Sequence, residues 1–177
     1  MTPFRETIQA YEHIAHTLFV PNERVQSVED IRPEPLIEAG YKTLFLDVDN
    51  TLVPYGQRLL SLQKIHWVEG LKMAGLSVFL VSNNSSHRRI KKIADQLSVY
   101  GIYFALKPFS FSLNSFAEDL GVNPRESVVI GDQVLTDILV GNWIGAYTIL
   151  CDPAGPLSFF KVLQQDFEKT ILSYLSW

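Results

Sequence analysis

Residues 41–51 read YKTLFLDVDNT, an apolar run that ends in two carboxylates, Asp47 and Asp49, spaced two positions apart. A short apolar run with polar residues at its end is typical of a buried strand in a parallel sheet. In extended backbone, side chains two residues apart share a face, so we expect the two carboxylates to lie together. Two neighbouring carboxylates do not both ionise at low cost, so this stretch predicts a strand end that needs a cationic partner. A polar turn that merely ends the strand is the alternative interpretation.

A second apolar run, at residues 128–130, ends in the same way. Gly131 and Asp132 follow it directly, and Asp137 comes five residues after Asp132. Carboxylates at the ends of buried strands are costly unless a cation neutralises them. A bound divalent metal would neutralise these carboxylates and leave one of them free for chemistry on a phosphate.

Strand and helix patterns alternate along most of the chain. The apolar runs typical of strands are residues 43–46, 77–81, 102–105, 128–130 and 147–150, and the helical stretches between them are 59–74, 87–97, 111–120 and 137–144. This alternation predicts an α/β fold, a three-layer Rossmann-like parallel sheet with helices on both faces. A short helix ending at Gly40 is expected before the sheet. A last helix over 157–174 is expected to pack on the sheet through Phe160, Leu163, Phe167, Ile171 and Tyr174.

The composition excludes several classes of protein. The chain has 177 residues, of which 47% are hydrophobic and 19% are charged, as in an ordinary globular domain. A formal net charge of −4 argues against a nucleic-acid-binding protein that acts through overall basicity. The single cysteine, Cys151, excludes an intrachain disulfide and is expected to be a small buried residue. With neither a membrane-spanning stretch nor a signal-peptide pattern, we expect a cytoplasmic protein, and peripheral membrane contact stays open.

Polar residues follow four of the predicted strands. Asp47, Ser82, Lys107 and Asp132 all stand at or just past a strand end. Ligands of open α/β sheets bind in the crevice outside the carboxyl ends of the strands. We therefore expect these four side chains to converge on one crevice.

The acidic residues suit phosphoryl transfer. Asp47 is the candidate nucleophile, because a carboxylate that attacks phosphorus gives an aspartyl-phosphate. Asp49 would protonate the leaving oxygen and later deprotonate a water molecule. Asp132 is placed to complete the ligands of a Mg²⁺ ion held with Asp47 and Asp49. Asp137 would hydrogen-bond Lys107, contact a water molecule bound to the metal, or cap the next helix. Thr51 is a further candidate that would support the metal ligands without binding the metal itself.

Ser82, Asn83 and Lys107 are the candidate phosphate-binding residues. Residues 82–84 offer a hydroxyl, an amide and backbone N–H groups at the start of a helix, where anions bind. Ordinary capping of the helix accounts for the same pattern. Lys107 can neutralise a phosphate and an aspartate together, and the alternative is a solvated loop lysine.

Taken in order, these residues resemble the four motifs of haloacid dehalogenase-type (HAD) phosphatases. The motifs are Asp-x-Asp-x-Thr at 47–51, Ser82, Lys107 and Gly-Asp-x-x-x-x-Asp at 131–137, and the resemblance covers residues 41–150. Four segments are also similar to the YqeG-like branch of HAD subfamily IIIA, which is related to mitochondrial phosphatidylglycerophosphatases. These segments are LFVPNERVQSVEDI at 18–31, VSNN at 81–84, Lys107-Pro108 and IGDQVLTD at 130–137.

The resemblance implies a role for each matching residue. Asp47 corresponds to the nucleophile, and Asp49 to an acid/base that also gives its backbone carbonyl to Mg²⁺. Asp132 matches the metal-binding aspartate, Ser82 the phosphate-binding hydroxyl and Lys107 the lysine that organises the phosphate. On this basis residues 41–177 form the HAD-like phosphatase domain, and residues 1–40 form an N-terminal helical extension packed on it.

The spacing of the motifs bears on the substrate. Between Asp47 and Ser82, and between Ser82 and Lys107, there is room for about one helix and one strand, so a cap domain does not fit. An open site suits a large substrate, and the resemblance suggests phosphatidylglycerophosphate, which would be converted to phosphatidylglycerol. A soluble phosphometabolite, a phosphoprotein or a non-catalytic phospho-accepting module are the alternatives, although Asp49 favours turnover.

Two further stretches bear on partners. The basic run at 87–92 (HRRIKK) would attract an anionic membrane or a second phosphate of the substrate, or it is a solvated helix face. Phe4, Ile8 and Tyr11 have helical spacing and suit a membrane surface, the core or a dimer contact. We thus expect a phosphorylated substrate and no nucleic acid. Presentation of the substrate by an anionic phospholipid surface and homo-oligomerisation both stay open.

Overall fold

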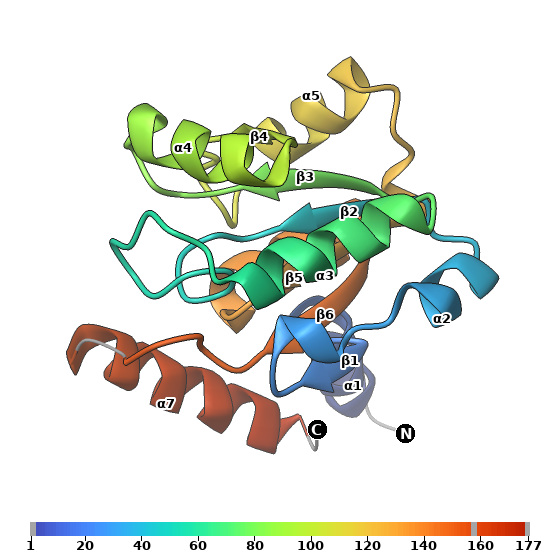
Figure 1. Ribbon diagram of the computed structural model, residues 1–177. Coiled ribbons are helices and arrows are strands. Elements are labelled where there is room, and N and C mark those ends of the chain that lie inside the picture. The colour runs from blue at the N-terminus through green and yellow to red at the C-terminus, as the bar shows by residue number, and fades with distance from the viewer. Residues whose placement is uncertain (1–2, 157–158, 176–177) are drawn as a thin grey trace.

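The computed structural model describes residues 3–156 and 159–175, with side chains for 10–156 and 162–175 (Figure 1). Six parallel strands form one sheet in the order β1-β6-β5-β2-β3-β4. The strands are β1 (Glu23–Val25), β2 (Thr43–Leu46), β3 (Ser77–Val81), β4 (Tyr100–Ile102), β5 (Ser127–Gly131) and β6 (Tyr147–Cys151). The predicted α/β fold with a parallel sheet is confirmed.

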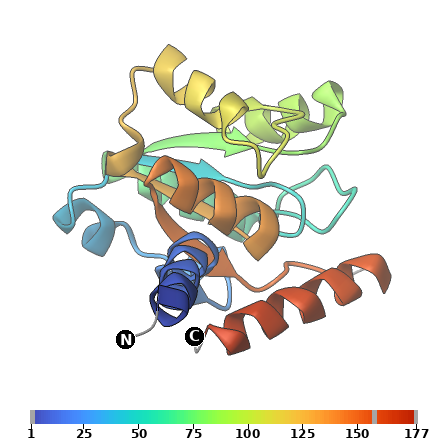
Figure 2. The same ribbon diagram turned by 180° about the vertical axis from the view of Figure 1, so that it is seen from behind.

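Helices cover both faces of the sheet (Figures 1 and 2). The helices are α1 (Pro3–Phe19), α2 (Pro33–Glu38), α3 (Leu62–Met73), α4 (His87–Leu97), α5 (Phe111–Asp119), α6 (Leu139–Ile144) and α7 (Phe159–Tyr174). Short 3-10 turns at Val28–Asp30 and Pro124–Glu126 precede α2 and β5, and a π-helical turn at Val134–Ile138 leads into α6. Helices α3 and α4 pack on one face, and α5 and α6 pack on the other.

The alternation of side chains along β2 explains the two core layers. Leu44 and Leu46 point to the cluster that contains α3 and α4, whereas Phe45 points to the cluster that contains α5 and α6. All three side chains are fully buried. A strand buried on both faces needs a continuous apolar run, which is the pattern that residues 43–46 show.

The strand order fixes the position of the crevice. From β2 the chain moves outward through β3 to β4 on one side, and then returns to place β5 and β6 on the other side of β2. Such a reversal of strand order opens a crevice at the carboxyl ends of the strands. Asp47 follows the central strand β2, and Asp132 follows its neighbour β5. The two acidic motifs therefore meet although 85 positions separate them.

The structure corrects the predicted strand at 102–105, because β4 spans Tyr100–Ile102 instead. After Ile102 the chain turns, and Phe104 and Leu106 adopt left-handed backbone with φ of 52° and 57°. The backbone N–H of Phe104 donates to the carbonyl of Asn84, so the segment pairs with the loop after β3 rather than continuing the strand. Its apolar composition alone cannot reveal this turn.

Two predicted helices begin elsewhere. The helix expected from residue 59 starts at Leu62, because the Ser61 hydroxyl accepts a hydrogen bond from the backbone N–H of Lys64 and caps the helix there. The helix expected from Asp137 is preceded by the π-helical turn from Val134, and its α-helical part starts at Leu139.

Strand β1 lies in the N-terminal 40 residues, where the sequence indicated only helices. It pairs with β6, so the sheet takes one edge strand from this segment. The boundary at residue 40 stays a prediction. In α1 the side chains of Phe4 and Ile8 lie outside the described residues, and Tyr11 is exposed, so Tyr11 does not pack in the core.

The inward face of α7 is also different from the prediction. Residues 157 and 158 lie outside the described part of the chain, as does the side chain of Phe160. Leu163, Phe167 and Tyr174 are exposed rather than packed on the sheet. The inward face instead carries Glu168 and Leu172, both buried. Leu172 packs with Leu150 of β6, so the helix does pack on the sheet as expected, but through another face than the predicted stripe, of which Ile171 is half-buried.

Two further features bear on access to the crevice. Within residues 3–156 no inserted domain separates β2, β3 and β4, as predicted for a core without a cap. Among the helices that the structure describes, none has both the length and the apolar character needed to cross a bilayer.

Candidate active site

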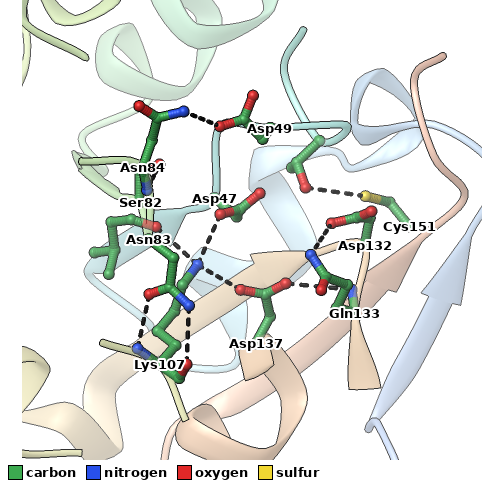
Figure 3. A network of polar contacts seen from close by, with 12 residues as sticks. Asp47, Asp49, Ser82, Asn83, Asn84, Lys107, Asp132, Gln133, Asp137 and Cys151 are labelled. Carbon is green, nitrogen blue, oxygen red and sulfur yellow. Dashed lines mark hydrogen bonds and ion pairs between the residues drawn. The ribbon is translucent and has the colours of Figure 1, made fainter. Parts of the chain in front are cut away.

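A pocket of about 450 Å³ opens at the carboxyl edge of the sheet. Five of the residues singled out in the sequence line it: Asp47, Asp49, Ser82, Asn83 and Lys107. They come from the loops after β2, β3 and β4. The sheet therefore brings three of the four side chains predicted to share a crevice to one cavity, and the fourth, Asp132, places a carboxylate oxygen within 4.8 Å of one from Asp47 (Figure 3).

Lys107 is the centre of a buried charge cluster below this pocket. Its Nζ donates to Oδ1 of Asp47 at 2.7 Å, to Oδ1 of Asp137 at 2.5 Å and to the carbonyl of Val81 at 2.8 Å (Figure 3). All three charged side chains are buried. The ion pair with Lys107 is one of the roles considered for Asp137.

The environment changes the proton affinity of this cluster. Burial, together with the charge of Asp137, raises the pKa of Asp47 to about 6, although Lys107 partly counteracts this effect. Burial alone would lower the pKa of Lys107, but the carboxylates of Asp137 and Asp47 outweigh it and raise that pKa. The lysine therefore stays charged, and the site carries a carboxyl group that is costly to ionise without a further cation.

The acidic residues fit a divalent metal. One carboxylate oxygen from each of Asp47, Asp132 and Asp137 lies within 4.8 Å of the others. Three carboxylates and the single ammonium of Lys107 leave a net charge of about −2, which a divalent cation would balance. Among the described side chains, Oδ2 of Asp47 is a buried oxygen without a hydrogen-bond partner. An oxygen in that state is suited to bind a metal ion.

The carboxylate of Asp49 belongs to a different set of contacts. The sequence-based prediction assigns the backbone carbonyl of Asp49 to the metal, and the buried triplet of carboxylates accordingly consists of Asp47, Asp132 and Asp137 without Asp49. Asp49 still lines the pocket, and its carboxylate accepts hydrogen bonds from the amide of Asn84 at 3.0 Å and the backbone N–H of Gly56 at 3.3 Å.

Arg89 is the residue near Asp49 that sequence reasoning missed. Its Nη1 donates to Oδ2 of Asp49 at 2.9 Å, and its Nη2 lies 2.8 Å from Oδ1. Its Nε donates to the carbonyl of Gln57 at 2.8 Å. Arg89 is only 4% exposed, so the interpretation of residues 87–92 as a solvated face is wrong for this residue. Its spacing from Ile93 and Leu97 on the buried face of α4 is the signal that could have identified it.

The loop after β3 holds Lys107 in place. The amide of Asn83 donates to the carbonyl of Lys107 at 2.8 Å, and the backbone N–H of Lys107 donates to Oδ1 of Asn83 at 2.7 Å. The Ser82 hydroxyl is buried and accepts from the backbone N–H of Asn84 at 3.1 Å. Asn83 thus fixes the backbone of Lys107 from two sides.

A close backbone approach positions Asp137. A Cβ at Gly131 would lie 2.2 Å from Cγ of Asp137, so only glycine leaves room for this carboxylate. The backbone N–H of Gln133 donates to the second oxygen of Asp137 at 3.2 Å. The π-helical turn at Val134–Ile138 carries Asp137, and such turns are frequent at functional sites.

Helix α7 also reaches the pocket. Gln164 lines the cavity and donates to Oε1 of Gln133 at 2.9 Å, and Gln133 in turn donates to Oδ1 of Asp132 at 3.2 Å. Sequence reasoning missed both glutamines, because Gln133 occupies an unspecified position of the motif at 131–137 and Gln164 stands in no motif.

Thr51 and Cys151 lie behind the acidic cluster. Both are buried, and Sγ of Cys151 lies 4.0 Å from the hydroxyl of Thr51. Burial, aided by the charge of Asp132, raises the pKa of the Cys151 thiol, so it stays protonated. The expectation of a small buried cysteine is confirmed.

Comparison with known proteins identifies the family. A family model described as HAD-hydrolase-like matches residues 105–152. The probable phosphatase YqeG of Bacillus subtilis (strain 168) is 38% identical over 158 residues, which cover 89% of this chain and 91% of that protein. The chain belongs to the haloacid dehalogenase-like phosphatases. It is therefore a hydrolase of phosphate esters, and the non-catalytic alternative is set aside.

Two more distant relatives resemble this phosphatase. Phosphatidylglycerophosphate phosphatase 1, chloroplastic/mitochondrial, of Arabidopsis thaliana is 25% identical over 142 residues, which cover 76% of this chain and 41% of that protein. The 3-deoxy-D-manno-octulosonate 8-phosphate phosphatase of Moraxella catarrhalis, crystallised with magnesium and phosphate ions, has a TM-score of 0.50 at 16% identity. That alignment covers 81% of this chain and 92% of the other, and it supports the fold.

Proposed function

We propose that this phosphatase is a Mg²⁺-dependent phosphomonoesterase that forms an aspartyl-phosphate on Asp47. The observation that carries the proposal is the buried cluster beneath the pocket. It contains a carboxylate with one unpartnered oxygen, Oδ2 of Asp47, beside the charged Lys107. A carboxylate in this setting has an oxygen available for attack and a fixed orientation.

Among the described side chains, those of Asp47, Asp132 and Asp137 lie close enough together to hold Mg²⁺, directly or through water. The family resemblance adds the backbone carbonyl of Asp49 to this set. When bound, the cation offsets the negative charge of the carboxylates and of the incoming phosphate.

In the first half of the proposed reaction, an oxygen of Asp47 attacks phosphorus and the bond from phosphorus to the leaving oxygen breaks. Asp49 gives its proton to that leaving oxygen, so the product leaves as an alcohol. The Nζ of Lys107 stabilises the charge on the phosphoryl oxygens, and Ser82 and Asn83 at the pocket wall bind the group through their polar atoms.

In the second half, a water molecule attacks the phosphorus of the aspartyl-phosphate. Asp49, now deprotonated, takes a proton from this water as the bond between phosphorus and Asp47 breaks. Phosphate leaves, and both carboxyl groups return to their starting state. Arg89 holds the Asp49 side chain at the pocket wall and so acts as a positioning residue.

We further propose phosphatidylglycerophosphate as the substrate and phosphatidylglycerol as the product. The relation to an Arabidopsis phosphatase of this lipid supports the assignment, and so does a site without an inserted cap. A cytoplasmic enzyme at the surface of a membrane would meet such a substrate. A soluble phosphometabolite or a phosphoprotein remains the competing substrate class.

The test is a phosphate-release assay with Mg²⁺ on phosphatidylglycerophosphate in mixed micelles and on several water-soluble phosphomonoesters. We expect a higher kcat/KM for the lipid than for every soluble ester, and loss of release with chelator. Acid-quenched enzyme should carry one phosphoryl group on the peptide that contains Asp47. Preference for a soluble ester would overturn the lipid assignment, and phosphate release without any phosphorylated Asp47 would overturn the mechanism.

A further inference from the structure

A cluster of exposed apolar side chains borders the catalytic pocket. The segment 103–111, here named the aromatic loop, exposes five large side chains at fractions between 46% and 81%. They are Tyr103, Phe104, Leu106, Phe109 and Phe111. Exposed apolar residues scattered singly are normal, but five within nine positions form a patch that marks an interaction site.

The backbone of the aromatic loop is built to present these side chains outward. Phe104 and Leu106 have positive φ, which is unusual for large side chains, whereas Ala105 and Lys107 between and after them are buried. The backbone N–H groups of Phe104 and Ala105 donate to carbonyls of the loop after β3, which fixes this alternation. Strain of this kind is retained at functional sites.

The aromatic loop lies at the mouth of the pocket. Lys107, which belongs to the loop, lines the cavity itself. Figures 1 and 2 show the connection from β4 to α5 at the same edge of the sheet as the connection from β2 to α3. That second connection contributes Tyr55, which lines the pocket and is also exposed. A surface that covered this edge would bring its phosphate groups directly to the site.

Helix α4, which carries several cations, contacts the aromatic loop at its first residue. The ring of His87, the first residue of α4, lies 4.9 Å from the ring of Tyr103. Arg88, Lys91 and Lys92 follow on the same helix and are exposed. Lys91 pairs with Asp95, which leaves Arg88 and Lys92 as cations without an ion pair among the described residues. In a chain of net charge −4, this basic edge is complementary to an anionic surface.

We propose that the aromatic loop and the cations of α4 dock this phosphatase on an anionic lipid bilayer, with the pocket facing the headgroups. Aromatic and aliphatic side chains insert at the depth of the headgroups, and lysine and arginine bind the anionic surface. The biological purpose of this docking rests on the proposed lipid substrate. Whether the surface binds a bilayer depends only on the side chains of the aromatic loop and α4.

The test measures binding to vesicles of phosphatidylcholine with and without 30 mol% phosphatidylglycerol, neither of which contains a phosphomonoester. The full chain should co-sediment with the anionic vesicles and bind neutral ones weakly. Phe109→Ser with Phe111→Ser should lower the partition coefficient by about 10-fold or more. Arg88→Gln with Lys92→Gln should lower it by about 30-fold on anionic vesicles. Hydrolysis of a soluble phosphomonoester should be unchanged in both double variants.

Met73→Ser is the matched control. Met73 is 88% exposed and ends α3, just before β3 begins, so it stands at the opposite edge of the sheet. The control should bind as the unaltered chain does. Absence of vesicle binding, or an equal loss in Met73→Ser, overturns the proposal. So does a dimer in solution that the phenylalanine substitutions dissociate, since the loop would then bind a second copy.

The two proposals fail separately in these experiments. Hydrolysis of phosphatidylglycerophosphate in micelles without any vesicle binding would refute the docking surface and leave the proposed function standing. Vesicle binding through the aromatic loop without hydrolysis of the lipid would refute the substrate and leave the docking surface standing.

Discussion

Replacement of Asp47 by asparagine should stabilise the metal-free protein above pH 6 while it abolishes turnover. The side chain is buried, one of its oxygens has no hydrogen-bond partner among the described residues, and its charge lies close to that of Asp137. Asparagine has nearly the same shape without the charge. Lys107 keeps its ion pair with Asp137, so the substitution leaves no isolated buried charge.

The magnitude follows from the proton affinity of Asp47. Its pKa in the folded protein is about 6 against an ordinary value of 3.8, which corresponds to a free-energy difference of about 3 kcal/mol. A carboxyl group with a raised pKa contributes stability below pH 4 that is lost as the pH rises through 6. The gain from Asp47→Asn should therefore be near zero at pH 4 and reach about 3 kcal/mol above pH 7. For a chain of this size that gain is about 6–12 °C in Tm.

Thermal unfolding in chelator from pH 4 to pH 8 measures this difference directly. Asp95→Asn is the control, because Asp95 is exposed and its ion pair with Lys91 should be worth less than about 1 kcal/mol at every pH. Added Mg²⁺ should raise the Tm of the unaltered chain more than that of Asp47→Asn. A variant that is no more stable than the unaltered chain at pH 8 would refute the buried-charge argument, as would a gain that is independent of pH.

Three further substitutions test the site. Asp49→Asn should lower kcat by about 10²–10⁴-fold and should also lower Tm, because the buried guanidinium of Arg89 loses its ion-pair partner; an unaltered kcat would exclude proton transfer by this residue. Arg89→Met should lower kcat by about 10–100-fold with little change in KM, but it should add almost nothing in an Asp49→Asn background; additive losses would indicate a purely structural role. Gly131→Ala should destabilise by about 1–3 kcal/mol and reduce activity, because the new methyl group displaces Asp137, whereas Gly70→Ala, with nothing within 4 Å, should be neutral or stabilising in a melting experiment.

The fold was predictable because apolar runs and strand ends are local features of the sequence. Residues 43–46 form a continuous apolar run, and Asp47 follows it at once, so both the strand and its polar end are visible without a structure. The short edge strand β1 was not predictable in this way. It has three residues, Glu23–Val25, and its pairing with β6 depends on residues more than 120 positions away.

The candidate site was predictable only where strand ends carry motifs. Asp47, Ser82, Lys107 and Asp132 follow strands, whereas Arg89 lies in a run of similar cations that differ only in which face of α4 they occupy. The orientation of α7 was harder still. Its apolar stripe suggested one buried face, but Glu168 is buried instead, where it accepts a hydrogen bond from the backbone N–H of Leu135. Long-range polar contacts of this kind leave no periodic signal.

The pairing of β1 with β6 separates the order of synthesis from the order of assembly. The backbone N–H of Asn22 donates to the carbonyl of Thr148, across 126 positions of the chain. On the ribosome, the first strand of the sheet to emerge must therefore wait for the last strand before it finds its partner. Until β6 has been synthesised, β1 has no strand to pair with, and the N-terminal segment of the nascent chain stays unpaired. By that time β2 and β5, the two strands that flank the catalytic centre, have both been synthesised.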